Sequence, residues 1–320
     1  MFAQFPQQVW VNEVVTRDGF QSEPEFVPTE TKIELINKLA RLGLNKIEVT
    51  SFVSPRAIPN LRDAEEVMRS ITRDTDTRYV ALVPNEKGCA RALELAVDEI
   101  NLVMSVSQSH NLANMRMTCE QSLQQFTRIA EMTAGTAMRL NGSLATAFGC
   151  PFEGSQAQER ILHFIDAYLE RGLHSITLAD TTGMAVPNQV HDLCQAVRER
   201  WPELEVTMHF HNTRGLGLSN VLAALAAGMN QYDASLGGLG GCPFAPGATG
   251  NICTEDLVHM LHEMGLSTGV NLDGLLAQSS ALAFIVGRDL PGQVGKAGPR
   301  TLTRPLPESV KQLMQQHGQN

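Results

Sequence analysis

The sequence lacks the features that mark three large classes of protein. No apolar run reaches the roughly 18 residues that a membrane-spanning helix needs. Lysine and arginine are scattered through a chain of net charge −9, so the basic face typical of nucleic-acid binding is missing. The amino terminus carries neither a secretory signal nor an Arg- and Ser-rich transit peptide. We therefore expect a cytoplasmic protein that binds neither membranes nor nucleic acid.

The cysteines form no recognisable framework. Six of them stand at irregular spacings without a C-x-x-C pair, which argues against a zinc knuckle or a set of disulfides. Most are expected to be small buried hydrophobic residues. A hydrophobic fraction of 43% is ordinary for a folded enzyme. At 320 residues the chain fits one α/β barrel, a fold that takes about 250 residues.

Short β-rich runs alternate with amphipathic helices along most of the chain. Strands are predicted at residues 9–15, 46–50, 79–83, 100–105, 138–146, 175–178, 205–209 and 231–235. Parallel strands need long helical connections, so this alternation predicts a closed (β/α)8 TIM barrel of the α/β class. An open doubly wound sheet is the alternative, but no G-x-G-x-x-G motif follows the first strand.

Helix signals extend beyond the predicted barrel. Thr118 and Ser155 each stand three residues before a glutamine and are predicted to cap helices. Further helices are predicted at 254–265 and 272–286, and a short one from Glu308. We therefore divide the chain into a barrel domain with a flanking helix, residues 1–290, and a loosely ordered C-terminal tail, residues 291–320.

Two histidines at the end of the seventh predicted strand are the strongest chemical signal. His209 and His211 point to the same side because strand side chains alternate between faces. Asp18 follows the first strand, and a glycine-rich loop after the eighth strand ends at Asn251. These positions share the face where barrels keep their active sites. One carboxylate, two imidazoles and one amide oxygen suit Mg²⁺ or Mn²⁺ better than structural zinc. The alternative for His209 is a core histidine.

Other polar residues map to the same face. Arg17 places a permanent cation where an oxyanion can develop, and the alternative is a salt bridge to Glu13 or Glu48. Cys242 lies in the glycine-rich loop and can approach a reacting carbon when the loop closes. A passive loop cysteine is the alternative there. Asp180 follows the sixth strand and is a weaker candidate for a supporting role.

Five segments closely resemble the 3-hydroxy-3-methylglutaryl-CoA (HMG-CoA) lyase family. They are Arg-Asp-Gly-Phe-Gln at 17–21, the run at 48–55, His-x-His at 209–211, the Gly-Gly-Cys-Pro loop at 240–251, and Thr-Glu-Asp-Leu-Val at 254–258. The resemblance runs from about residue 11 to about residue 287, and the loop motif is highly specific. It implies a metal-dependent retro-Claisen cleavage of HMG-CoA to acetoacetate and acetyl-CoA, a reaction of leucine degradation and ketone body formation.

The resemblance also implies roles for individual residues. The metal ion (Mg²⁺, Mn²⁺ or Co²⁺) is implied to be held by Asp18, His209, His211 and Asn251. Substrate contacts are implied for Arg17, Gln21 and Glu48, with Arg17 stabilising the enolate and Cys242 acting as the catalytic acid. Asp180 and Glu13 are expected to contact these residues without touching the metal ion or the substrate. The acyl-CoA substrate is the implied partner, and a homodimer is the implied assembly.

Several alternatives stay open at this point. The base that removes the hydroxyl proton is Asp18, His209 or a metal-bound hydroxide. Departures from the family pattern at 105–114, at 212–214 and at Pro24 leave room for a citramalyl-CoA lyase or a lyase for longer branched 3-hydroxyglutaryl-CoA analogues. A Claisen-condensing synthase is disfavoured because such enzymes carry extra C-terminal domains. A non-catalytic metal-binding barrel is disfavoured because Arg17, Asp18 and Cys242 are all present.

Overall fold

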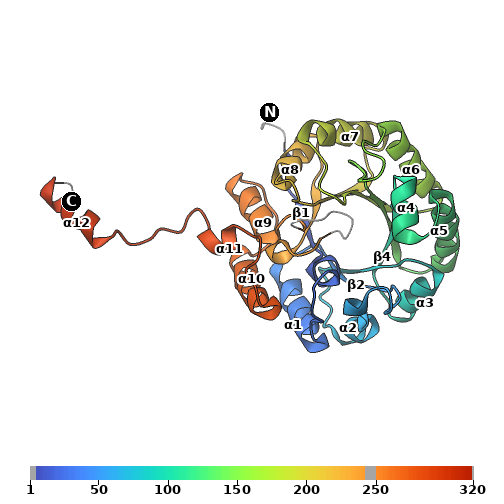
Figure 1. Cartoon of the computed structure of the whole chain (residues 1–320), viewed down its shortest axis with the longest axis horizontal. Coiled ribbons are helices and arrows are strands. Elements are labelled where there is room, and N and C mark those ends of the chain that lie inside the picture. The colour runs from blue at the N-terminus through green and yellow to red at the C-terminus, as the bar shows by residue number, and fades with distance from the viewer. Residues whose placement is uncertain (1–4, 242–249, 319–320) are drawn as a thin grey trace.

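Eight parallel strands close into a barrel in the computed structural model, which describes residues 5–241 and 250–318 (Figure 1). The strands follow their order in the sequence, and the last pairs with the first from Trp10 and Gln231 to Glu13 and Ala234. The predicted (β/α)8 barrel is therefore confirmed, and the open doubly wound sheet is excluded.

The strand bounds agree with the predictions to within a few residues. They are β1 (Trp10–Glu13), β2 (Lys46–Ser51), β3 (Arg78–Leu82), β4 (Glu99–Ser105), β5 (Arg139–Ala145), β6 (Ser175–Asp180), β7 (Glu205–Phe210) and β8 (Gln231–Ala234). Every residue of β2 and β6 is buried, as expected of parallel strands that are covered on both faces.

Helices surround the barrel, and one more lies on the inner side of this ring. The outer helices are α1 (Thr29–Leu39), α2 (Ala64–Ser70), α3 (Glu86–Glu94), α5 (Cys119–Thr133), α6 (Gln158–Glu170), α7 (Pro187–Arg200) and α8 (Gly217–Ala226). The additional helix α4 (Gln108–Met115) lies inside this ring beside α5 (Figure 1). Within the described ranges, no helix is both long and apolar enough to cross a membrane.

The two helix-cap predictions have different outcomes. Thr118 caps α5 in a complete capping box with Gln121, as predicted. The prediction for Ser155 is wrong, because α6 begins after Ala157. Cys150 and Gly154 bond to each other through both backbone amides, which holds the chain in a turn up to Gly154. The helix therefore starts later than the sequence pattern indicates.

The C-terminal helices lie on one side of the barrel. α9 (Thr254–Glu263) and α10 (Leu272–Val286) match their predictions, and α11 (Val294–Ala297) packs near α9, where the amide of Val294 donates to Asp256. α12 (Glu308–Gln316) has no buried residue and stands apart from the barrel (Figure 1). The division of the chain at residues 290 and 291 stays a prediction.

An ion-pair network closes the end of the barrel where the strands begin. Lys46 on β2 lies 2.8 Å from Glu99 on β4 and 2.7 Å from Glu205 on β7. Arg78 and Arg139 bond to the same two carboxylates. These charges satisfy one another at that end, opposite the candidate chemical groups.

Candidate active site

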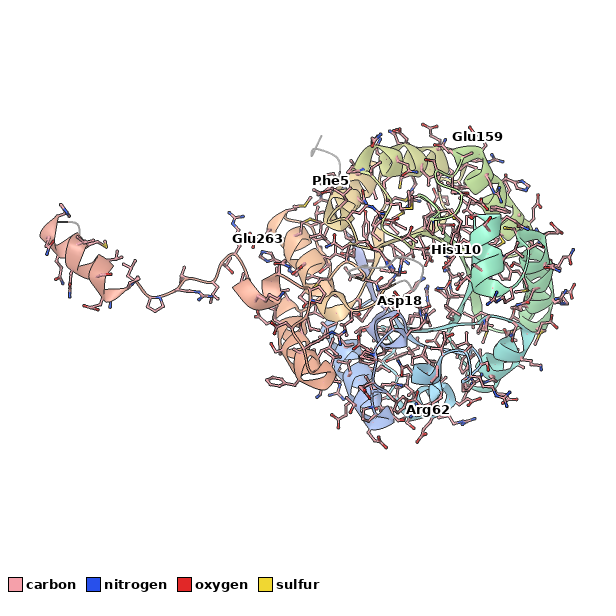
Figure 2. The ribbon with its side chains drawn as sticks, in the orientation of Figure 1. Phe5, Asp18, Arg62, His110, Glu159 and Glu263 are labelled. Carbon is pink, nitrogen blue, oxygen red and sulfur yellow. The ribbon has the colours of Figure 1, made fainter. Side chains whose placement is uncertain are left out.

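A cavity of about 730 Å³ opens at the carboxyl ends of the strands. Arg17, Asp18, Gln21, His209 and His211 line it, as the sequence predicts for the active face. Residues of α4 form another part of its wall. Figure 2 labels Asp18, near the barrel axis, and His110, on α4. The cavity therefore lies between the predicted chemical groups and a helix that the sequence did not single out.

The turn after β1 has a conformation that the sequence did not predict. Residues 9–15 were expected to be one strand, but β1 ends at Glu13 and η1 (Val15–Gly19) is a single π-helical turn. The amides of Arg17, Asp18 and Gly19 all donate to the Val14 carbonyl, at 3.2, 2.8 and 3.3 Å. Turns of this kind are frequent at functional sites. This one buries the side chains of Arg17 and Asp18 at the cavity wall.

Asp18, His209 and His211 come together as a candidate metal centre. Their possible ligand atoms all lie within 4.8 Å of one another, and all three residues are buried. The two histidine Nε2 atoms are 3.2 Å apart, and His211 Nε2 is 3.7 Å from Asp18 Oδ2. Two nitrogens bound side by side to an ion at about 2.1 Å are separated by about 3 Å. This spacing fits a divalent ion held by one carboxylate and two imidazoles.

Asp233 fixes the orientation of one of these histidines. Its Oδ2 lies 3.1 Å from His209 Nδ1, and its Oδ1 accepts a hydrogen bond of 2.8 Å from Asn12 Nδ2. A carboxylate at Nδ1 keeps the proton on that nitrogen, so the lone pair of Nε2 faces His211. The sequence analysis does not identify Asp233, although the alternation of β8 places it on the inner face.

The charge states of Asp18 and His211 suit a cation. Burial alone raises the pKa of Asp18, but Arg17 and the two histidines outweigh it and hold this pKa at about 2. Burial and the neighbouring His209 lower the pKa of His211 to about 4. Burial opposes protonation of His209, but Asp233 outweighs it and raises that pKa. An ionised carboxylate and a neutral His211 are the forms that bind metal ions.

Asn251 lies next to Asp18, as the sequence predicts. Its Nδ2 donates to Asp18 Oδ2 at 2.6 Å and to the Leu239 carbonyl at 3.1 Å. Its Oδ1 is buried and has no hydrogen-bond partner among the residues described. Gly240 is required there, because a Cβ atom would lie 2.5 Å from the Asn251 amide nitrogen. Asn251 is therefore a neighbour of the candidate metal centre. A direct bond from its Oδ1 to the ion stays a prediction.

Arg17 is held by two carboxylates. Its Nε donates to Glu48 Oε2 and its terminal nitrogen to Asp18 Oδ1, both at 2.5 Å. The predicted alternative of a salt bridge to Glu48 is therefore present. Despite burial, these two carboxylates raise the pKa of Arg17 further, so its charge is permanent. A guanidinium that is fixed and charged at a cavity wall can stabilise an oxyanion without reorganising.

Two further carboxyl groups lie behind the cavity. Glu13 is fully buried, accepts from the amides of Val15 and Leu236 at 2.9 Å, and its pKa is raised by burial to about 8. Asp180 accepts from the amide of Met184 at 2.7 Å, and burial raises its pKa to about 6. Neither lines the cavity. Their positions agree with the supporting roles that the sequence predicts, and the roles themselves stay predictions.

Cys242 lies outside the described residues. The adjacent Gly241 lines the cavity, and its carbonyl accepts a hydrogen bond from Ser22 Oγ at 3.4 Å. The other five cysteines are buried, as the sequence predicts.

Asp233→Asn is expected to weaken metal binding. Asn12 Nδ2 and the protonated His209 Nδ1 donate to different oxygens of this carboxylate, and in an amide one of those two atoms becomes an NH₂ group that cannot accept. The expected loss of Mn²⁺ affinity is about 10- to 100-fold, measured by isothermal titration calorimetry. Asp273→Asn, an exposed change on α10, is the matched control. Wild-type affinity in Asp233→Asn would show that Asp233 does not orient the ligand.

Comparison with known proteins identifies relatives over nearly the whole chain. The HMGL-like family model matches residues 8–282. An (R)-citramalyl-CoA lyase from Chloroflexus aurantiacus is 41% identical over 92% of this chain and 96% of its own length. A hydroxymethylglutaryl-CoA lyase from Bacillus subtilis is 40% identical over 90% of this chain and 97% of its own.

A solved structure supports the same assignment. The HMG-CoA lyase from Acinetobacter baumannii, in complex with coenzyme A and 3-methylmalate, is 54% identical and superimposes with a TM-score of 0.92. The match covers 95% of this chain and all of that one. The resemblance noted in the sequence is thereby confirmed. The chain belongs to the HMGL-like family, as an HMG-CoA lyase-like carbon–carbon lyase.

Proposed function

We propose that this enzyme is a divalent-metal-dependent lyase that cleaves HMG-CoA to acetoacetate and acetyl-CoA. The observation that carries the proposal is the buried group of Asp18, His209 and His211 with the Arg17 guanidinium beside it on one cavity wall. A metal centre next to a fixed cation suits a reaction in which an alkoxide and then an enolate develop.

The proposed ligands of the ion are Asp18, His209 and His211, with Asn251 as the fourth. Nitrogen and oxygen donors of this kind suit Mg²⁺ or Mn²⁺, and Co²⁺ is the further candidate. When bound, the ion polarises the tertiary hydroxyl of the substrate and lowers its pKa. A pKa of about 2 makes Asp18 a poor base at neutral pH, which favours the role of a ligand for this carboxylate.

Arg17 is proposed to bind the thioester oxygen. When the bond between C2 and C3 breaks, its electron pair moves onto the acetyl-CoA part as an enolate, and C3 becomes the ketone of acetoacetate. The guanidinium then faces the new negative charge. Glu48 and Asp18 hold the guanidinium in place, so it needs little reorientation to reach the transition state. Gln21 and Glu48 are the further proposed substrate contacts.

Cys242 is proposed to return a proton to C2 of the enolate. This role rests on the Gly-Gly-Cys-Pro motif and on the position of Gly241 at the cavity. The thiol donates its proton and the enolate becomes acetyl-CoA. The thiolate regains a proton before the next turnover, in balance with the proton that the C3 hydroxyl of the substrate gives up.

A citramalyl-CoA lyase is the second candidate, because a relative of that name is 41% identical to this chain. Such an enzyme would release pyruvate in place of acetoacetate by the same bond cleavage. Lyases for longer branched 3-hydroxyglutaryl-CoA analogues are a third possibility. A cytoplasmic location and a homodimer are the remaining parts of the proposal.

One panel of substrates tests this function. HMG-CoA, both citramalyl-CoA enantiomers and a longer 3-hydroxyglutaryl-CoA analogue are assayed for acetyl-CoA release with Mg²⁺ or Mn²⁺. We expect cleavage of HMG-CoA with the highest kcat/KM, loss of activity with excess chelator, and recovery when metal is returned. Full activity of metal-stripped enzyme in chelator would overturn the metal role, and a preference for a citramalyl-CoA would transfer the assignment to the second candidate.

Arg17→Met is expected to lower kcat by roughly 10²- to 10³-fold, because the lost charge acts on the enolate that forms only in the transition state. Steady-state kinetics and Mn²⁺ titration are measured together. The loss in kcat should far exceed any loss of metal affinity. A loss below about threefold would leave Arg17 as a structural partner of Glu48 alone.

Cys242→Ala is expected to fold and to bind metal normally, yet to lose most turnover, because the proton donor is gone. In wild-type enzyme, iodoacetamide should label Cys242 rapidly, and a substrate analogue with metal should protect it. The five buried cysteines serve as internal controls that react slowly in both states. Equal labelling with and without ligand, together with near wild-type turnover of the alanine variant, would make Cys242 a bystander.

A further inference from the structure

Among the described residues and apart from the histidines, the cavity wall carries one cation that no carboxylate neutralises. Apart from the histidines, its charged lining residues are Arg17, Asp18, Arg116 and Asp233. Arg17 is bonded to Asp18 and to Glu48. Arg116 is exposed at the end of α4, and within residues 5–241 and 250–318 its side chain has neither an ion pair nor a hydrogen bond. Its charge is therefore available to a ligand.

The backbone at Arg116 is in a conformation that favours glycine. Its φ of 58° and ψ of 26° are left-handed, and its amide donates to the Leu112 carbonyl to end α4. A side chain in this region costs free energy relative to glycine, so glycine is the usual residue at such a helix end. Left-handed residues other than glycine concentrate at ligand sites. The strain and the unpaired charge occur at the same residue.

Helix electrostatics explain only part of this arrangement. A cation near the C-terminal end of a helix is stabilised by the helix dipole. Arg69 in the last turn of α2 occupies a similar position, is exposed, and does not line the cavity. Arg69 therefore provides a comparison that separates the effect of the dipole from an effect of ligand binding.

The position of Arg116 matches the part of the substrate that remains at the surface. The reacting acyl group belongs at the buried group formed by Asp18, His209 and His211, whereas Arg116 is exposed at the cavity edge. Coenzyme A continues from the thioester through pantetheine to a diphosphate and a 3′-phosphate. A polyanion approaching a chain of net charge −9 needs a local positive group. A guanidinium can bind two phosphate oxygens at once.

We propose that Arg116 binds a phosphate of the coenzyme A part of the substrate and so selects full CoA thioesters over pantetheine thioesters. This inference rests on the proposed function, since it takes the substrate to be an acyl-CoA. The group bound is a phosphate, and coenzyme A offers two: the diphosphate and the 3′-phosphate.

The test compares binding of CoA, dephospho-CoA and pantetheine to full-length, Mg²⁺-loaded Arg116→Gln by isothermal titration calorimetry. We expect the affinity for CoA to fall roughly tenfold, as for the loss of a charge-assisted hydrogen bond, and the affinity for pantetheine to be unchanged. Dephospho-CoA keeps the diphosphate and lacks the 3′-phosphate. If Arg116→Gln weakens binding of both CoA and dephospho-CoA, Arg116 binds the diphosphate. If it weakens binding of CoA alone, Arg116 binds the 3′-phosphate. Arg69→Gln should match wild type with all three ligands.

Kinetics provide a second arm. With the preferred acyl-CoA, Arg116→Gln should raise KM roughly tenfold and leave kcat unchanged, and the change should vanish with the matching pantetheine thioester. An equal loss with both thioesters would place Arg116 at the acyl end and overturn the proposal. CoA binding needs no turnover, so failure of the proposed function would appear as absent cleavage with binding intact.

Arg116→Gly separates a structural role from a binding role. Glycine fits the left-handed backbone, so the thermal unfolding midpoint should rise while CoA affinity falls as in Arg116→Gln. Unchanged CoA affinity in both variants would overturn the proposal and leave Arg116 as a helix-end residue only.

Discussion

The buried Arg17 guanidinium, shared between Glu48 and Asp18, is the interaction on which the site depends. It joins β2 to the turn after β1 through two bonds of 2.5 Å. Burial alone would raise the pKa of Asp18, but this cation, helped by the two histidines and Asn251, holds that pKa at about 2. The same contacts keep the guanidinium charged and fixed. One ion-pair cluster therefore prepares both the proposed metal ligand, Asp18, and the cation that we propose to face the enolate, Arg17.

The barrel brings the other site residues to the Arg17 cluster. Parallel strands bring the ends of β1, β7 and β8 to one face, so residues more than 180 positions apart in the chain become neighbours. Asp233 on β8 orients His209 on β7, and Asn251 reaches Asp18 from beyond β8. At the other end, Lys46 on β2 pairs with Glu99 on β4 and Glu205 on β7. The ion-pair network around Lys46 and the candidate site thus occupy opposite ends of the barrel.

Sequence patterns predict those features that depend on periodicity and residue type. The alternation of strands and helices is enough for the barrel, and His-x-His at a strand end is enough to place His209 and His211 together with Asp18. Local turn geometry is harder to predict. The valine-rich run into Arg17 has the composition of a strand, yet three amides converge on one carbonyl there and form η1. Asp233 was missed because a single aspartate in a short strand carries no motif.

The central claim is that Asp18, His209 and His211 bind one divalent ion. Pulsed electron paramagnetic resonance on the Mn²⁺-loaded enzyme tests it most directly, because the ¹⁴N couplings of bound imidazoles are counted. The account predicts couplings from two histidines in the wild type and from one in His211→Ala, with the Asp273→Asn control retaining both. A spectrum of hexaaqua Mn²⁺ without nitrogen coupling, or one that His211→Ala leaves unchanged, would contradict it.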